Sequence, residues 1–259
     1  MSGGDLADRR DADAIVDVRD LTIGYGGSIL LRDASFDVRR GEIFAILGRS
    51  GSGKSTLLRH LVGLERPIAG TIAVLGVAPI APRDGPPPYG VTFQSGALLG
   101  SMTVGENVAL PLERWTALGH DLVDVLVRAK LRVVGLAASA TKMPSELSGG
   151  MTTRAAIARA MALEPPLVFL DEPTAGLDPV TALELDELLL ALNRTLGLTV
   201  VLVTHELRSI YRIATRCLMI DRSTRSVIAV GDPRVLREAS SDARVRAFLG
   251  RPEPERGSS

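Results

Sequence analysis

The chain has 259 residues, of which 46% are hydrophobic and 23% charged, as expected of a globular protein with a large core. Lys plus Arg and Asp plus Glu number 30 each, and this zero net charge excludes an overall basic attraction to nucleic acid. No apolar run approaches the about 20 residues that cross a bilayer, and the polar start MSGGDLADRRDADA lacks the apolar core of a secretory signal. The single cysteine, Cys217, excludes an internal disulfide and is expected to be a buried structural thiol, because it lies in the apolar run CLMI.

Strand patterns dominate the first part of the chain. Alternating or continuous apolar runs predict strands at Val16–Ile23, Ala34–Val38, Ile43–Leu47, Thr71–Val77 and Gly90–Phe93. Helical spacing is found at Ser55–Leu64, directly after a run of glycines, and the Pro-rich stretch PIAPRDGPPPYG must be a loop.

Helical patterns dominate the middle of the chain and alternate with strands afterwards. Helical periodicity runs from Gly105 to Val134, and further helices are predicted at Ser148–Leu163, Pro179–Leu196 and Glu206–Ala214. Buried strands are predicted at Leu167–Leu170 and Thr199–Val203, and edge strands at Leu218–Ile220 and Val227–Val230. The polar residues 1–13 and the tail from Arg251 are expected to be disordered. Alternating strands and helices predict an α/β fold, and the long helical stretch between strands suggests an inserted subdomain.

The segment GRSGSGKS matches the phosphate-binding pattern GxxxxGK[ST] and stands between the strand IFAIL and the helix TLLRHL. Its residues are Gly48, Arg49, Ser50, Gly51, Ser52, Gly53, Lys54 and Ser55. Glycines let the backbone amides surround a phosphate chain, Lys54 would neutralise the β- and γ-phosphates, and Ser55 would bind Mg²⁺. Thr56 is expected to contribute near the α-phosphate. A glycine-rich turn that binds nothing is the alternative.

The segment LVFLDEP places two carboxylates at the end of an apolar strand. Asp171 could hold Mg²⁺ through water, and Glu172 could polarise an attacking water molecule. Adjacent acids at the end of a buried strand are costly unless a metal and a substrate organise them, although a solvated acidic turn is the alternative.

These two segments, in this order with LSGGM at Leu147–Met151 between them, resemble the ATP-binding subunits of ABC transporters from about Val16 to Gly231. The resemblance implies a P-loop NTPase (RecA-like) core with an antiparallel β subdomain and an inserted α-helical subdomain at about 95–163. The ATPase domain would span 14–240, followed by a C-terminal helix and disordered tail at 241–259. Ser148, Gly149 and Gly150 match the family's signature loop, which caps the γ-phosphate of ATP held by a second copy; Met151 departs from the usual Gln or Glu.

The resemblance also implies roles for four scattered residues. Gln94 matches the glutamine that links Mg²⁺ and the attacking water to the helical subdomain, and His205 matches the switch histidine that touches the γ-phosphate. Asp178 matches the aspartate that senses the second copy, and it can also cap the helix that starts at Pro179. Tyr25 matches the aromatic that stacks on adenine, although a Tyr in a Gly-rich turn has structural uses as well. The catalytic set is therefore Glu172, His205 and Gln94, and the metal set is Ser55, Gln94 and Asp171.

A longer stretch narrows the resemblance. Four segments are similar to those of the phospholipid-transport ATPases of the Mla/Mce type: FQSGALLGSMTVGENVALPLER at Phe93–Arg114, LSGGM, DPVT and the terminal VRAFLG. Leu99 stands where that subgroup often has Phe. This similarity implies an ATP-dependent lipid transporter subunit at the cytoplasmic face of the inner membrane. Its expected partners are a second copy, an integral membrane permease, an MCE-type lipid-binding protein and a small cytoplasmic regulator, with no nucleic acid.

Apolar residues after Gln94 suggest where a permease helix would dock, unless they pack the subdomain core; they are Leu98, Leu99, Met102, Val104 and Leu110. Two other functions stay open. One is transport of a different cargo, such as an amino acid, ion or drug. The other is a soluble ATPase of the same family that acts on DNA or ribosomes, which the single cassette, the lack of long heptads and the zero net charge disfavour.

Overall fold

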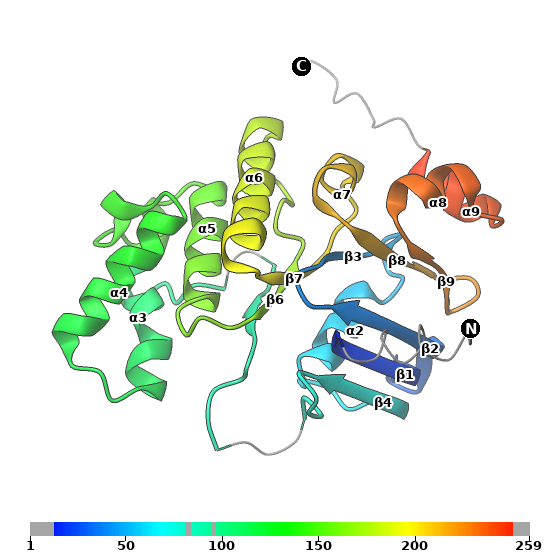
Figure 1. Ribbon diagram of the computed structural model, residues 1–259, viewed down its shortest axis with the longest axis horizontal. Coiled ribbons are helices and arrows are strands. Elements are labelled where there is room, and N and C mark those ends of the chain that lie inside the picture. The colour runs from blue at the N-terminus through cyan, green and yellow to red at the C-terminus, as the bar shows by residue number, and fades with distance from the viewer. Residues whose placement is uncertain (1–12, 81–83, 95–96, 251–259) are drawn as a thin grey trace, which may run out of the picture.

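The computed structural model describes residues 13–80, 84–94 and 97–250. The predicted disorder of residues 1–13 and of the tail from Arg251 falls outside these ranges, apart from Asp13. Two sheets lie near the middle and one end of the molecule, and helices extend to the opposite end (Figure 1). Among the described residues, no helix combines the length and apolarity that a bilayer span requires.

The larger sheet has six strands in the order β5-β6-β7-β3-β8-β9. Their bounds are β3 Ile43–Gly48, β5 Gly90–Thr92, β6 Leu167–Asp171, β7 Thr199–Val203, β8 Arg216–Asp221 and β9 Ser226–Gly231. All pairings are parallel except that of β8 with β9. The prediction of β8 as an edge strand was wrong, because β8 pairs with β3 on one side and β9 on the other.

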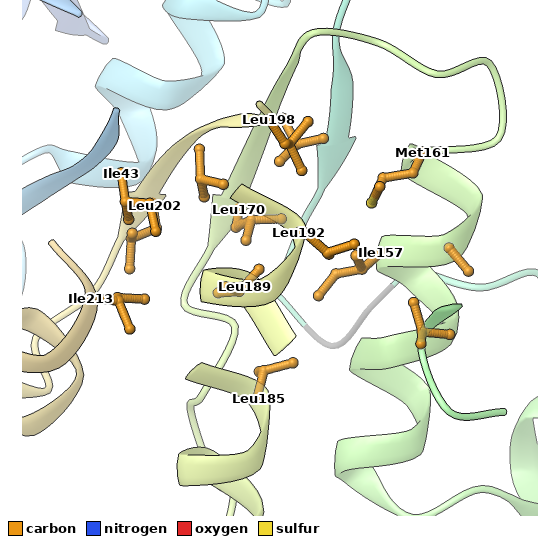
Figure 2. Close-up of a cluster of buried hydrophobic side chains, with 14 of the residues drawn as sticks. Ile43, Ile157, Met161, Leu170, Leu185, Leu189, Leu192, Leu198, Leu202 and Ile213 are labelled. Atoms are coloured by element: carbon orange, nitrogen blue, oxygen red, sulfur yellow. The ribbon is translucent and has the colours of Figure 1, made fainter. Parts of the chain in front are cut away.

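Side chains of the central strands alternate between two hydrophobic cores, as the two-residue period of a strand requires. On one face, Ile43, Leu170 and Leu202 pack with helices α5, α6 and α7, which span Gly149–Ala160, Pro179–Leu196 and Leu207–Ile213. Figure 2 shows side chains of α6 among those of the sheet and of α5. On the other face, Phe44 and Phe169 pack with helix α2, Lys54–Leu61, and with the smaller sheet.

The smaller sheet is antiparallel, in the order β2-β1-β4, with bounds Ala14–Tyr25, Ser28–Arg39 and Ala69–Val74 for β1, β2 and β4. Strand β2 begins earlier than the sequence predicts, because Arg32 and Asp33 interrupt the apolar alternation without ending the pairing. Arg216 of β8 joins the two sheets: its Nη1 lies 3.1 Å from Asp37 Oδ2 and 3.0 Å from Glu42 Oε1.

The predicted helical subdomain is present between β5 and β6. It comprises α3 Val104–Trp115, α4 His120–Val133, the short 3₁₀ turns η1 Ala137–Ser139 and η2 Pro144–Glu146, and α5. The continuous helical period from Gly105 to Val134 is divided into two helices by Thr116–Gly119, where the chain leaves helical geometry. A capping box starts α3: the Glu106 N–H donates to Thr103 Oγ1, and the Thr103 N–H donates to Glu106 Oε2.

The C-terminal part adds α8 Pro233–Ala239 and α9 Ala243–Leu249, which lie beside β9 at the end of the molecule opposite α3 and α4 (Figure 1). The sequence predicted one C-terminal helix, and it missed α8 because this helix has only seven residues. Cys217 is fully buried in β8, as predicted, and burial raises the pKa of its thiol to about 12. A thiol so protected is a packing residue at neutral pH.

Candidate functional site: a phosphate-binding loop facing paired carboxylates

The candidate site lies where the parallel strands β3, β6 and β7 end at their carboxyl termini. In an open parallel sheet, this edge is where ligands bind. A cavity of about 1290 Å³ is found there, and its walls come from the loop after β3, from Gln94, from the loop after β6 and from the segment His205–Ser209 after β7. The fold therefore brings predicted site residues into one cavity although Gly48 and His205, the first and last of them, are 157 positions apart in the sequence.

The glycine-rich loop stands between strand β3 and helix α2, as the sequence predicts. Gly48 tolerates no side chain, because a Cβ atom there would lie 2.5 Å from Ser52 Oγ and 2.7 Å from the Ile220 carbonyl oxygen. Gly53 has a φ of 93° and ends the loop at the start of α2, a conformation that glycine adopts readily. Ser52 Oγ is buried and has no hydrogen-bond partner among the described residues. The backbone thus turns tightly enough to present amides at a helix start.

Lys54 lies at the base of this loop and is largely buried. Its Nζ donates to the carbonyl oxygens of Gly48, at 3.0 Å, and Arg49, at 3.4 Å. Burial lowers the pKa of Lys54, while the nearby charges of Glu172 and Asp171 favour its protonated form. The ammonium group is therefore held by backbone oxygens in a position where anionic oxygens of a ligand could replace them.

Ser55 and Asp171 meet across the site: Ser55 Oγ donates to Asp171 Oδ1 at 3.0 Å. Burial raises the pKa of Asp171, against the lowering effect of the hydrogen bond from Ser55. Two oxygen donors at this spacing suit a hard cation such as Mg²⁺. Gln94, the third residue of the predicted metal set, lines the larger cavity with Ser55 and a smaller one with Asp171.

Glu172 and His205 are in direct contact in the site, with His205 Nδ1 2.6 Å from Glu172 Oε2. The Glu172 side chain is mostly buried, whereas that of His205 is largely exposed within the cavity. Glu172 has a φ of 51°, and its N–H donates to the Val203 carbonyl oxygen of β7. A left-handed conformation is costly for a non-glycine residue, and such strain is concentrated at functional sites.

A second, smaller cavity of about 310 Å³ adjoins the first and shares Gln94, Glu172, Ala175 and Leu177 with it. Its other walls include Gly149 and Thr152 of α5, so it connects the carboxylates of β6 to the start of the helical subdomain. Gln94 itself is exposed at the end of β5. The structure therefore places Gln94 between the two cavities, beside Glu172 in both walls.

The segment Ser148–Gly150 starts α5, and Ser148 caps the helix by accepting a hydrogen bond from the Met151 N–H. Ser148 and Gly149 are exposed, whereas Gly150 is buried against Thr181 of α6. Asp178 caps α6 in the same manner, accepting from the N–H groups of Val180 and Thr181. The capping role that the sequence allowed for Asp178 is thus present.

Six predicted nucleotide contacts are not among the lining residues of the larger cavity: Tyr25, Ser52, Ser148, Gly149, Gly150 and Asp178. Of these, Tyr25 at the end of β1 is 79% exposed. Conversely, the cavity wall includes Asp186, Ser209 and Arg212, for which the sequence predicted no role, and Phe248, which lies in the VRAFLG segment but was given no site role. No local pattern marks Asp186, Ser209 and Arg212, because the packing of α6 against α7 brings them together.

Comparisons with known proteins agree with this geometry. A family model described as "ABC transporter" matches residues 31–175. The "Intermembrane phospholipid transport system ATP-binding protein MlaF" of Escherichia coli (strain K12) is 42% identical over 240 residues, covering 91% of this chain and 88% of the relative. The "Methionine import ATP-binding protein MetN 2" of Rhodopseudomonas palustris is also 42% identical, over 85% of this chain and 59% of the relative.

Solved structures extend the similarity to three dimensions. CbiO1 from Clostridium perfringens, part of the ABC transporter complex CbiONQ, has a TM-score of 0.75 and 29% identity, covering 86% of this chain and 90% of that one. A dimeric post-hydrolysis state of the ATP-binding cassette MJ0796 bound to ADP and Pi has a TM-score of 0.73 and 30% identity, covering 84% and 98%. The chain belongs to the ABC transporter family, as one of its ATP-binding and ATP-hydrolysing subunits with the predicted P-loop α/β fold.

Proposed function

We propose that this subunit hydrolyses ATP to energise phospholipid transport between membranes. The proposal rests above all on one arrangement, in which Lys54, Ser55, Asp171, Glu172 and His205 converge at one edge of the sheet. The cargo is inferred from the relative in Escherichia coli that is named for phospholipid transport and covers 91% of this chain.

The proposed chemistry assigns one task to each side chain. Lys54 neutralises the β- and γ-phosphates, and Ser55, Gln94 and Asp171 hold Mg²⁺ directly or through water. Glu172 polarises the attacking water, and His205, which contacts Glu172, touches the γ-phosphate. No group of three His, Cys, Asp or Glu side chains gathers as a metal site in the described part of the chain. This absence fits Mg²⁺, which takes few protein ligands and fills its coordination with phosphates and water.

Two copies are proposed to complete each nucleotide site. The phosphate loop of one copy would face Ser148–Gly150 of the other, with Asp178 at the contact and Tyr25 stacking on adenine. Support comes from the exposure of Ser148 and Tyr25 away from the cavity and from the dimeric relative. With Ser148→Cys and Arg49→Cys chains mixed at saturating ATP, crosslinking between copies is expected. If no crosslinked dimer forms at saturating ATP, the shared site is contradicted.

The membrane permease is proposed to dock on the segment after Gln94. Leu99 and Leu110 are exposed at 45% and 36%, and Met102 is partly exposed, whereas Leu98 packs partly against the core. Val104 is fully buried and was wrongly included in the docking surface. An MCE-type lipid-binding protein and a small cytoplasmic regulator are the further proposed partners, and the cytoplasmic face of the inner membrane is the proposed location.

The cargo is tested by isolating the detergent-solubilised complex with the tagged chain and reconstituting it in liposomes. ATP-dependent transfer of a fluorescent phospholipid to acceptor vesicles is expected, with no ATP-dependent uptake of labelled methionine. Methionine uptake without lipid transfer would replace the proposal by the import function for which the MetN relatives are named.

The docking surface is tested in the same complex with Leu99→Glu and Met102→Glu. Each is expected to keep the ATPase activity of the isolated chain and to lose transport. Leu122→Glu is the matched control, because Leu122 is 56% exposed but belongs to α4 and not to the proposed docking segment. Variants that still recover the permease and transport at the unaltered rate would exclude this surface.

A further inference from the structure

The buried side chain of Asn107 organises the segment that follows Gln94. Asn107 lies in the first turns of α3, with no exposed surface. Its Oδ1 accepts from the Leu99 N–H at 2.8 Å, and its Nδ2 lies 3.1 Å from the Leu99 carbonyl oxygen and 3.1 Å from that of Met102. A third oxygen, that of the Thr103 carbonyl, lies 3.0 Å from Nδ2. One amide thus fixes both ends of the turn from Leu99 to Thr103.

These bonds make the turn depend on Asn107. A side-chain amide offers two N–H donors and one oxygen acceptor, and here both kinds of group are engaged with backbone. Removing a partner that leaves a buried polar group unsatisfied costs about 1–3 kcal/mol for each such group. An apolar residue at this position would therefore leave the Leu99 N–H without its acceptor and release the turn.

The same amide reaches the helix that carries the signature segment. Arg159 in the last turn of α5 directs Nη1 at Asn107 Oδ1, 3.4 Å away. Arg159 is partly buried at this contact, and this burial lowers its pKa. Helix α5 begins directly after Ser148. Asn107 Oδ1 is therefore shared between the turn after Gln94 and the helix that presents Ser148–Gly150.

A second attachment joins the start of α3 to the chain just before the signature segment. The Val104 N–H donates to the Lys142 carbonyl oxygen and the Gly105 N–H to that of Ala140, both at 2.8 Å. A Cβ atom on Gly105 would lie 3.0 Å from the Ala140 carbonyl oxygen, so this approach is close. The turn and α3 are therefore linked to α5 near its last turn, through Arg159, and to the chain before its start, through Ala140 and Lys142.

We propose that Asn107 is a positioning residue that joins the permease-facing turn Leu99–Thr103 to helix α5, so that the turn and Ser148–Gly150 move as one unit. Asn107 lines neither cavity of the candidate site and acts through these two segments. The inference rests on the proposed docking of a permease at Leu99 and Met102. It predicts that losing the amide uncouples the permease from ATP hydrolysis without weakening nucleotide binding.

The test measures ATPase kinetics of the detergent-solubilised complex and of the isolated chain for Asn107→Leu and Asn107→Asp. Asn107→Leu has a similar volume but no polar atoms, and Asn107→Asp keeps the acceptor oxygen while losing the donors. For both, KM for ATP of the isolated chain is expected within about twofold of the unaltered protein, since uniform nucleotide binding is untouched. Permease stimulation of kcat is expected to fall about tenfold for Asn107→Leu and less for Asn107→Asp.

A control separates coupling from simple destabilisation. Val127→Ala removes buried volume from α4, a different helix of the same subdomain, and should lower the melting temperature to a similar extent. It is expected to keep permease stimulation. Equal loss of stimulation in Val127→Ala, or full stimulation in Asn107→Leu, would overturn the inference. If Asn107→Leu fails to fold, Asn107→Asp decides: unaltered stimulation overturns the inference, and reduced stimulation at unaltered KM supports it.

Arg159→Met provides a second measurement. If Asn107 and Arg159 act through one connection, the double variant Asn107→Leu/Arg159→Met should lose no more stimulation than Asn107→Leu alone. Multiplied losses would show independent effects and contradict the shared connection. The unaltered complex separates failure of the proposed function from failure of this inference. If the permease neither binds nor stimulates the unaltered chain, the proposed function fails. If the permease stimulates the unaltered chain and Asn107→Leu equally, only the role of Asn107 is refuted.

Discussion

His205 Nδ1 lies 2.6 Å from Glu172 Oε2, which places the residue proposed to contact the γ-phosphate directly against the carboxylate proposed to activate water. The two come from successive parallel strands, since β6 ends at Asp171 and β7 at Val203. The Glu172 N–H also bonds to the Val203 carbonyl oxygen. The backbone of one strand end therefore positions the side chain of the other.

Glu172→Gln tests this pair. The amide keeps the shape but loses the charge that polarises water, so the rate of phosphate release should fall about 10²–10⁴-fold while ATP still binds. ATP-bound dimers should accumulate, as measured by light scattering after size exclusion. Glu184→Gln, at an exposed carboxylate on α6 outside the cavity, is the matched control and should hydrolyse normally. Monomeric Glu172→Gln protein that hydrolyses ATP freely would refute the assignment.

The Ser55–Asp171 hydrogen bond leads to a prediction about metal. Asp171→Asn can still accept from Ser55 but lacks the charge that would orient water on Mg²⁺, so the Mg²⁺ concentration for half-maximal activity should rise about 10–100-fold. Chelation with EDTA should abolish hydrolysis in the unaltered protein, and added Mg²⁺ should restore it. Full turnover in excess EDTA would show that the oxygen set does not serve a metal.

Gly150 should not tolerate alanine, because its Cβ would lie 2.3 Å from Thr181 Cγ2. Thr181 is held in place by its own hydrogen bond to Asp178, so it cannot turn away without cost. We expect Gly150→Ala to lower the free energy of unfolding by about 1–3 kcal/mol in urea titrations and to reduce ATPase activity. Adding Thr181→Ser, which removes Cγ2 and keeps the hydroxyl, should recover most of both.

Gly100→Ala is the control for the Gly150 prediction, because a Cβ at Gly100 meets nothing within 4 Å. It should leave the free energy of unfolding close to that of the unaltered protein. A Gly150→Ala protein that is as stable as Gly100→Ala would mean that α5 and α6 can separate at this contact without cost.

Asp186 gives stability a pH dependence. Burial raises its pKa from 3.8 to about 6, against a hydrogen bond from Ser209 and the charge of Arg212, while Glu206 raises it further. Between pH 3.8 and about 6, the Asp186 carboxyl is therefore protonated in the folded state but ionised in the unfolded state. Stability from this group is therefore fully present below about pH 4, is lost as pH rises to about 6, and stays lost above, to a total on the order of 2–3 kcal/mol.

Asp186→Asn should remove this dependence, because an amide does not ionise. Urea unfolding of both proteins between pH 4 and 8 should therefore show a difference in unfolding free energy that changes in favour of the variant as pH rises through the window of 3.8 to about 6. A difference that is independent of pH would show that Asp186 ionises alike in both states.

Much of the fold could be predicted because local signals were strong. The continuous apolar runs at β3, β6 and β7 allow only buried strands, and Pro179 with Asp178 marks the start of α6 to the residue. The sequence did not predict the break between α3 and α4, because both helices continue the same hydrophobic period. The break at Thr116–Gly119 carries no proline or strong stop signal ahead of Gly119. The short helix α8 was missed because its seven residues hold too few turns for a period.

By itself the sequence determined the chemistry, because a phosphate loop is defined by contiguous residues: glycines where side chains would collide, then Lys54 and Ser55 at the helix start. It also placed Asp171 and Glu172 at the end of one predicted strand and His205 just after the next. Only the tertiary structure decided what those residues touch, since the order of the strands in the sheet sets Ser55 against Asp171 and Glu172 against His205. The roles of Asn107 and Asp186 likewise follow from packing between helices distant in sequence, which no local pattern encodes.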